Sequence, residues 1–105
     1  MNEITADLDI LVAEIKGKFS DTEIILFGSY AKGNATKESD IDLCIIIDKT
    51  LMRKIDLIRE VRRTIAPIST RPIDIVVYSR DEFNQRSLIN TTFEYKIKNE
   101  GLKIA

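Results

Sequence analysis

The chain has 105 residues, of which 44% are apolar, and its 16 basic and 17 acidic side chains leave a formal net charge of −1. This composition is typical of one soluble globular domain and argues against a dedicated electrostatic binder of nucleic acid, which would carry a basic excess. The lack of histidine and the single cysteine exclude a Ser-His-Asp triad, a zinc site of cysteine and histidine, and an internal disulfide.

The first half of the chain predicts a helix and two strands. Apolar residues at helical spacing predict an amphipathic helix over residues 3–18, and the short apolar run at residues 23–27 (EIILF) predicts a buried strand that ends at Gly28. A polar loop follows, with a helical turn from Ser29, and residues 41–47 (IDLCIII) predict a second buried strand. The apolar stripe of the helix consists of Ile4, Leu8, Leu11, Val12, Ile15 and Phe19.

The second half predicts a helix, a third strand and a further helical segment. A helical pattern opens at Thr50 and ends at a proline, which lacks the backbone donor that a helix needs. Residues 73–78 (IDIVVY) predict a third buried strand, and Ser79 is placed to cap the helix that follows. Residues 89–100 continue helically up to Gly101, and the final LKIA predicts a short edge strand. The apolar stripe of the helix from Thr50 consists of Leu51, Ile55, Ile58, Val61 and Ile65.

These elements indicate one compact αβ unit. No repeat, low-complexity tract or linker divides the sequence, so residues 1–105 are expected to form a single domain. The N-terminal sequence MNEITADLDI lacks the basic start and apolar core of a signal peptide, and no apolar run approaches the roughly 20 residues that cross a bilayer. We therefore expect a cytoplasmic protein, a compartment in which a single free cysteine is common.

Three aspartates interrupt the otherwise apolar strands. Asp40 and Asp42 are two residues apart at the start of the second strand, so their side chains point to the same side of the sheet, and Asp74 interrupts the third strand. If the two strands are neighbours, about 4.8 Å apart, the three carboxylates converge. At roughly 6 Å and an effective dielectric of about 20, each pair repels by about 3 kcal/mol. Hard oxygen ligands favour Mg²⁺ or Mn²⁺, and the spacing suits two such ions in a phosphoryl transfer.

A phosphate-binding turn is predicted next to these aspartates, in the string ILFGSYAKG. Gly28 lacks the Cβ that would hold a phosphate away from the backbone, and Ser29 can cap the helical turn and offer a hydroxyl and an N–H to phosphate oxygens. Lys32 adds positive charge, and Gly33 allows the chain to turn out. The sequence contains no GxxxxGK[ST] loop, so this is a different type of triphosphate site.

Together these motifs resemble the signature of the DNA polymerase β superfamily of nucleotidyltransferases. The resemblance depends on the Gly28-Ser29 pair, the string DIDL that follows after ten intervening residues, and the later Asp74. The string GSYAKGNATKESDIDL, the short chain and the EG near its end are similar to the minimal nucleotidyltransferases (MNT, MntA-like) that accompany HEPN-domain proteins as antitoxins. Lys32 stands where many relatives have arginine, which keeps the charge but loses the bidentate fork.

This resemblance implies a small mixed β-sheet flanked by helices, of the DNA polymerase β-like nucleotidyltransferase fold, with two Mg²⁺ ions and ATP or another NTP as donor. Asp40 and Asp42 would bind both metals, and Asp74 would hold the catalytic metal and help to activate the acceptor hydroxyl. The hydroxyl would attack the α-phosphate, and pyrophosphate would leave. The implied nucleotide-binding residues are Gly28, Ser29, Lys32 and Ser39.

In the MntA-like branch the implied acceptor is a tyrosine hydroxyl of the HEPN-type toxin, which is silenced by AMPylation. The chain would then form a hetero-oligomer with that partner, a homodimer also being open, and would contact neither a membrane nor nucleic acid directly. The alternative is a non-catalytic antitoxin or regulatory subunit that neutralises its partner by binding, with a vestigial or NTP-sensing site. Transfer to a small molecule such as an aminoglycoside is a third hypothesis.

Other conspicuous residues have simpler interpretations. Cys44 lies among apolar residues and is expected in the core rather than as a nucleophile. Tyr30 is expected as a loop aromatic near the mouth of the nucleotide site. A group of basic residues is more typical of a solvated helix face than of a nucleic-acid contact: Arg53, Lys54, Arg59, Arg62 and Arg63. The aromatic residues expected in the core or at a partner interface are Tyr78, Phe83, Phe93 and Tyr95.

Overall fold

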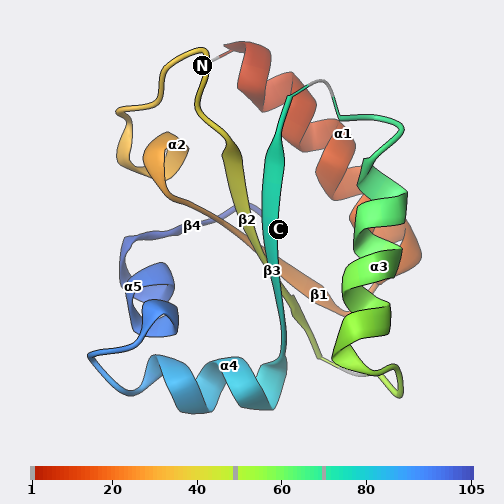
Figure 1. The fold of residues 1–105 in the computed structure, drawn as a ribbon, viewed down its shortest axis with the longest axis vertical. Coiled ribbons are helices and arrows are strands. Elements are labelled where there is room, and N and C mark those ends of the chain that lie inside the picture. Colours follow the sequence, from red (N-terminus) through yellow and green to blue (C-terminus); the bar gives the residue numbers. More distant parts are fainter. Residues whose placement is uncertain (1, 49, 70) are drawn as a thin grey trace.

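The strands form one mixed sheet, drawn near the centre of Figure 1. The computed structural model describes residues 2–48, 50–69 and 71–105, with side chains from residue 6 onward. The strand order is β3-β2-β1-β4; β2 and β3 run parallel, whereas β1 is antiparallel to β2 and β4. This confirms the predicted mixed α/β architecture. The strands are β1 (Thr22–Phe27), β2 (Ile41–Ile47), β3 (Ile73–Ser79) and β4 (Leu102–Lys103).

The strands lie where the sequence predicts them. β2 has the predicted bounds, and β1 and β3 are each one residue longer than expected. The LKIA segment provides β4, which pairs with β1 through Leu102 opposite Leu26 and so forms an edge of the sheet. The helices are α1 (Asn2–Lys18), α2 (Ser29–Lys32), α3 (Lys54–Ile65), α4 (Arg80–Ser87) and α5 (Phe93–Glu100).

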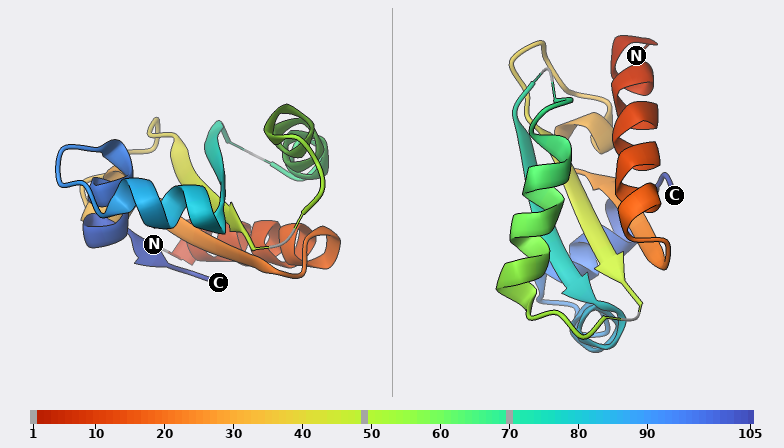
Figure 2. Two further views of the ribbon diagram at one scale, coloured as in Figure 1. Left: turned by 90° about the horizontal axis from the view of Figure 1, so that it is seen from below. Right: turned by 90° about the vertical axis from the view of Figure 1, so that its right-hand side faces the viewer.

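One face of the sheet packs against α1 and α3, which face the viewer in the right-hand view of Figure 2. Alternate residues of a strand point to this face, so β1 and β2 supply a continuous apolar layer. Burying one such side chain stabilises the fold by about 1.5–3 kcal/mol, which makes this layer the main core. The stripe of α1 packs as predicted, except that the side chain of Ile4 lies outside the described residues. The buried residues include Leu11, Ile15, Ile24, Leu26, Ile41, Leu43, Ile45, Ile47, Leu57, Val61 and Ile65.

The opposite face packs against α4 and α5, which hold a smaller core. Glu94 of α5 is only 5% exposed and accepts two hydrogen bonds, from Tyr78 Oη at 2.5 Å and from Arg86 Nε at 3.0 Å. Burial acts to raise the pKa of Glu94, but these two hydrogen bonds outweigh it and the pKa is lowered. The satisfied carboxylate therefore ties α5 to β3 and α4 without an unpaired buried charge. The apolar members of this core are Ile25, Cys44, Ile46, Tyr78, Phe83 and Ile97.

The helix expected from Thr50 begins later, and the first two residues of its predicted apolar stripe are not packed. α3 starts at Lys54, and Leu51 and Ile55 are exposed rather than packed. Thr50 Oγ1 accepts a hydrogen bond from the backbone N–H of Met52 at 3.0 Å, a local turn that competes with helix formation. The rest of the predicted stripe is confirmed: Val61 and Ile65 are buried and Ile58 packs partly buried against the core, where Leu57 joins them.

The helix expected over residues 89–100 is also shorter, because α5 starts at Phe93 after a break from α4. The hydroxyl of Thr92 accepts a hydrogen bond from the Tyr95 N–H at 3.1 Å, which is the geometry of an N-cap, and donates to the Arg86 carbonyl oxygen at 2.7 Å. Thr92 therefore opens a new helix instead of lying within one. The predicted cap of α4 is confirmed, since Ser79 Oγ accepts from the Glu82 N–H at 3.2 Å.

Gly101 provides a test of how α5 is joined to β4. Its φ of −78° is open to any residue, but an added Cβ would lie 2.5 Å from both Ile25 Cγ2 and the Ile97 carbonyl oxygen. We expect Gly101→Ala to lower the free energy of unfolding by about 1–3 kcal/mol in urea denaturation, because neither neighbour can move aside freely. The matched control is Gly17→Ala on exposed α1 surface, where nothing lies within 4 Å and alanine favours the helix by roughly 0.5–1 kcal/mol. Equal stabilities of the two variants would contradict this packing.

Candidate active site

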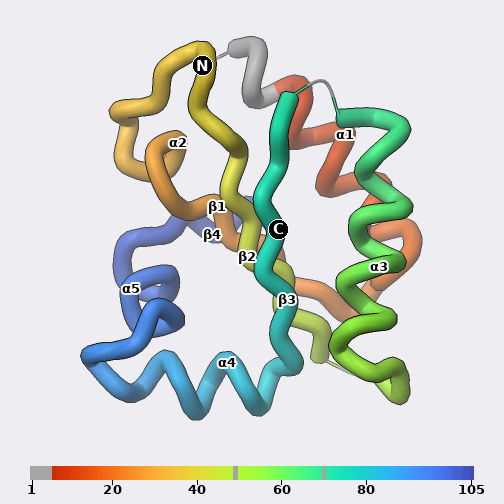
Figure 3. The backbone as a smooth tube through the Cα atoms, viewed as in Figure 1, coloured from red at the N-terminus to blue at the C-terminus, as the bar shows by residue number. Residues whose placement is uncertain are grey.

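The three predicted aspartates are brought together by the pairing of β2 with β3. Asp42 and Asp74 are direct register partners in this parallel ladder, and Asp40 precedes β2 by one residue. Figure 3 shows the two strands running side by side along this stretch. Asp42 is half-buried, whereas Asp40 and Asp74 are exposed. The predicted convergence depends on these strands being neighbours, which they are, and Asp42 and Asp74 share the face of the sheet that carries α4 and α5.

The carboxylates repel one another. Burial raises the pKa of Asp42, and the negative charges of Asp74 and Asp40 raise it further. No salt bridge to any of the three is formed by the side chains that the structure describes. Carboxylates without a cationic partner among the described side chains attract a cation when they are ionised.

The carboxylates suit an open magnesium site that water and substrate phosphates complete, and not a site closed by protein ligands alone. In the described part of the chain, no three or more acidic or cysteine side chains are arranged so that they could hold a metal ion by themselves. Mg²⁺ is commonly held by one or two carboxylates, with waters and substrate phosphates completing its shell, so an open pair such as Asp42 and Asp74 suits it. Thiolate chemistry is excluded at this point, because Cys44 is fully buried and burial raises its pKa to about 12.

Gly28 is required beside Asp42 for two independent reasons. It follows Phe27, the register partner of Asp42 in the antiparallel β1–β2 ladder. Its φ of +74° lies in the left-handed region that favours glycine, and a Cβ added there would collide with the Asp42 carboxylate oxygen Oδ2. The turn therefore brings bare backbone against the Asp42 carboxylate, an approach that a residue with a side chain would not allow.

The turn after Gly28 differs in one respect from the sequence prediction. Gly28, not Ser29, is the N-cap residue of α2, and no side-chain hydrogen bond caps this helix among the described residues. Ser29 is instead the first helical residue, and Gly33 ends the helix with a φ of +79°. The expected capping role of Ser29 is therefore wrong, and its hydroxyl is not used for that purpose.

The loop from α2 to β2 is closed by Ser39. Ser39 Oγ accepts a hydrogen bond from the Thr36 N–H at 2.8 Å, and the Ser39 N–H donates to the Thr36 carbonyl oxygen at 3.1 Å. This turn positions Asp40, the next residue. Tyr30 is not a loop aromatic but a core residue with 8% exposure, and its hydroxyl accepts from Arg71 Nη1 at 2.9 Å.

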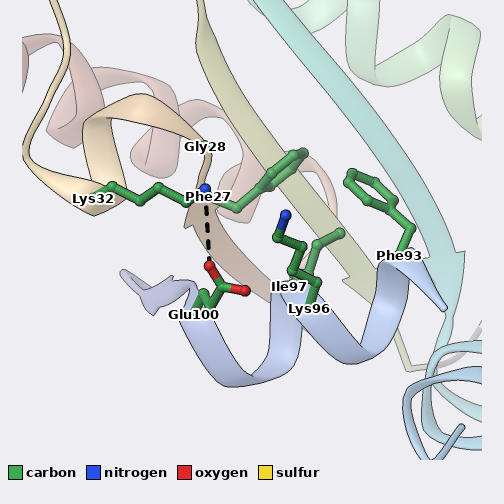
Figure 4. Close-up of a pocket in the computed structure, with 7 residues that line it drawn as sticks. All are labelled: Phe27, Gly28, Lys32, Phe93, Lys96, Ile97 and Glu100. Atoms are coloured by element: carbon green, nitrogen blue, oxygen red, sulfur yellow. Dashed lines mark ion pairs between the residues drawn. The ribbon is translucent and has the colours of Figure 1, made fainter. Parts of the chain in front are cut away.

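A pocket of about 160 Å³ lies beside the Gly28 turn, between the end of β1, α2 and α5. Figure 4 shows Phe27 and Gly28 on one side and the side chains of α5 on the other. Lys32 Nζ and Glu100 Oε1 form an ion pair of 3.8 Å across it, between side chains that are about half exposed. The rings of Phe27 and Phe93 meet edge to face with centroids 5.4 Å apart. The lining residues are Phe27, Gly28, Lys32, Phe93, Lys96, Ile97 and Glu100.

None of the nucleotide-binding residues predicted from the sequence lies on α5, although α5 forms one wall of this pocket. The sequence predicts Phe93 as a core or interface aromatic, and Lys96 belongs to none of the motifs described above. The Glu100-Gly101 pair is part of the family resemblance, but the resemblance implies no role for it in nucleotide binding. The basic residues of α3 fit their simpler interpretation, since Arg53 and Arg59 pair with Asp56, and Arg63 pairs with Glu60, on the exposed helix face.

A mixed sheet that carries paired aspartates beside a glycine-serine turn defines a nucleotidyltransferase domain. Residues 8–101 match the family model described as "Nucleotidyltransferase domain", and the chain belongs to this family. It is 35% identical over 104 residues to "Putative protein adenylyltransferase MJ0604" of Methanocaldococcus jannaschii, with 96% of each chain covered. It is 32% identical over 106 residues to "Putative protein adenylyltransferase MJ1305" of the same organism, with 72% of each covered.

The fold is shared with a solved structure of a nucleotidyltransferase. A crystal structure titled "putative nucleotidyltransferase" from Sulfolobus solfataricus superposes with a TM-score of 0.62, covering 93% of this chain and 76% of that one. The sequence identity is 18%, so this likeness shows the fold alone. Among the described residues, no helix has both the length and the apolar character needed to cross a bilayer.

The electrostatic cost at Asp42 can be measured by its pH dependence. Because the folded-state pKa of Asp42 is raised above its usual value of 3.8, ionisation of this group destabilises the fold at neutral pH. Without divalent cations, we expect Asp42→Asn to raise the free energy of unfolding at pH 7 by up to about 1 kcal/mol. The gain should shrink as the pH falls through the raised folded-state pKa and become small below 3.8, where aspartate is mostly protonated in both states.

Urea denaturation at pH 7 and pH 3.5, with chelator present, gives the comparison. Asp9→Asn on the exposed surface of α1 serves as the matched control and should change little at either pH. If Asp42→Asn destabilises the chain at pH 7, or stabilises it equally at both pH values, the proposed repulsion is wrong.

Proposed function

We propose that this nucleotidyltransferase is an adenylyltransferase that moves AMP from ATP to a hydroxyl group of a protein. The observation that carries the proposal is the register pairing of Asp42 with Asp74, directly beside the bare backbone of Gly28. The relatives MJ0604 and MJ1305, each named "Putative protein adenylyltransferase", support AMP as the transferred group and a protein as its acceptor.

The donor phosphates would bind at the Gly28 turn. Gly28 keeps the backbone clear of any Cβ, and Ser29 at the first position of α2 has a hydroxyl that caps nothing. Lys32 supplies the positive charge, and a phosphate that binds it would replace the carboxylate of Glu100. Breaking the pair costs little free energy, because a half-exposed ion pair contributes at most about 1 kcal/mol.

The carboxylates would hold magnesium and direct the acceptor. Asp42 and Asp74 would hold the metal, with Asp40 beside them adding negative charge, and the ion would supply charge stabilisation to the transferring phosphoryl group when bound. Asp74 is exposed on the edge strand β3, so an acceptor hydroxyl can approach it from outside the sheet and give up its proton there. The hydroxyl oxygen forms a bond to the α-phosphorus, and the bond from that phosphorus to the bridging oxygen breaks, so that pyrophosphate leaves.

The acceptor that we propose is a tyrosine of a HEPN-domain toxin, with this chain as its antitoxin. This finer assignment is supported by the resemblance of the string GSYAKGNATKESDIDL to MntA-like proteins. Modification of the toxin would silence it.

Transfer can be tested with the chain, α-labelled ATP, Mg²⁺ and a HEPN-domain partner. We expect an AMP-sized mass on a partner tyrosine, and Asp42→Asn should slow labelling by ~100-fold or more, because it removes a metal-binding carboxylate. Asp9→Asn keeps the same change of charge on exposed α1 surface and should label at the wild-type rate. Equal labelling by wild type and Asp42→Asn would refute the proposal.

The same assay separates catalysis from binding. If Asp74→Asn still neutralises the toxin in cells while labelling is lost, the chain acts as a binding antitoxin and not through AMPylation.

Metal dependence gives a further prediction. Chelation should abolish labelling, and Mg²⁺ or Mn²⁺ should restore it, whereas Zn²⁺ should not, because the site offers oxygen ligands and no histidine. A thermal-shift measurement with ATP present checks the same point: Mg²⁺ should raise Tm for the wild type and not for Asp42→Asn. Full activity in chelator would contradict the metal assignment.

A further inference from the structure

The pocket between β1, α2 and α5 offers a site of its own beside the phosphate turn. Its side walls are mostly apolar, formed by Phe27, Phe93 and Ile97, and charged groups stand at its rim. With a volume of about 160 Å³ it is smaller than the roughly 300–1,000 Å³ that encloses a drug-sized ligand. The pocket therefore suits one planar ring system, and not a whole nucleotide.

The position of the pocket indicates that its ligand is part of the donor and not of the acceptor. Gly28 belongs both to the pocket lining and to the turn that would bind the donor phosphates. Asp74, which would meet the acceptor, lies on β3, and the strand order places β2 between it and β1. Two strand spacings amount to roughly 10 Å, so the pocket and the acceptor side are on different sides of the carboxylates. A ring in the pocket would therefore belong to the molecule whose phosphates lie at Gly28.

The lining chemistry fits a nucleobase. Phe93 at the start of α5 is 49% exposed although it touches Phe27, so part of its ring remains available for stacking. Figure 4 shows the Lys96 side chain beside these two rings. Lys96 is exposed and forms no salt bridge with the described side chains, while Glu100 is engaged only by Lys32 at 3.8 Å. A base presents an apolar face for stacking and a polar edge for such donors and acceptors.

We propose that this pocket holds the base of the donor nucleotide, with Phe93 as the stacking residue and Lys96 and Glu100 at the polar edge of the base. The inference rests on the proposed function, because it needs a nucleoside triphosphate donor. It adds to that function a base subsite on α5, and it makes Phe93 a determinant of donor affinity that inorganic triphosphate would not use.

Titration calorimetry with two ligands tests the proposal, in the presence of Mg²⁺. ATP carries the base, and inorganic tripolyphosphate carries only the charges. We expect Phe93→Ala to weaken ATP binding by about 10-fold, from the loss of base stacking, and to leave tripolyphosphate binding unchanged. The matched control is Tyr95→Ala, which removes an exposed aromatic ring from the same helix outside the pocket and should change neither affinity.

Two further measurements separate a direct contact from a disturbed fold. Phe93→Trp keeps an aromatic face and should retain ATP affinity within about threefold of the wild type. Nuclear Overhauser contacts between adenine protons and the Phe93 ring should appear in the wild-type complex. Circular dichroism and Tm establish that Phe93→Ala is folded.

The outcomes distinguish a failure of the base pocket from a failure of the proposed function. Unchanged ATP affinity in Phe93→Ala would overturn the base pocket and leave the proposed function standing. Equal weakening of ATP and tripolyphosphate would also overturn it, because the effect would then act on the phosphate turn. If neither ligand binds the wild type, the proposed function fails and the base pocket fails with it.

Discussion

The parallel register between β2 and β3 is the constraint on which the site depends. It sets Asp42 opposite Asp74 on one face of the sheet, while the apolar residues on either side of Asp42 enter the core on the other face. A shift of one residue would bury a carboxylate and expose the apolar set, so the main core and the site enforce the same register. The antiparallel partner β1 completes this arrangement, because Phe27 opposite Asp42 delivers the Gly28 turn to that carboxylate.

The carboxylates that the proposed function needs lower the stability of the fold. The neighbouring carboxylates, with a raised pKa at Asp42 and no salt bridge from the described side chains, oppose the ionisation of Asp42 and so destabilise the fold at neutral pH. The surrounding structure compensates through buried apolar layers and through Glu94, whose hydrogen bonds from Tyr78 and Arg86 fix α5 to the sheet. α5 is thereby held close enough to the Gly28 turn to form the second wall of the pocket. A polar network away from the carboxylates thus positions the element that we propose binds the base.

Much of the fold could be predicted from the chain, because buried strands leave strong local signals. The apolar runs at β1, β2 and β3 were found to within one residue, and the turn at Gly28-Ser29 and the DIDL string marked the site. The errors concern polar residues at helix ends. Thr50 forms its own turn and Thr92 caps a new helix, and both depend on hydrogen bonds that periodicity does not encode. The later start of α3 leaves Leu51 outside the helix, whereas Val61 and Ile65 of the predicted stripe are buried as expected.

The sequence by itself determined which residue types carry the chemistry: aspartates in apolar strands, a glycine beside a serine, and no histidine or thiolate to compete with hard oxygen ligands. It also determined the strands, since a short apolar run bounded by polar residues is a local property of a chain. Only the tertiary structure decided that Asp42 faces Asp74, that Gly28 lies against Asp42, that Tyr30 is buried, and that Phe93 and Lys96 of α5 border the Gly28 turn. These relations join residues far apart in the chain, and they are set by strand order and packing, which no local pattern specifies.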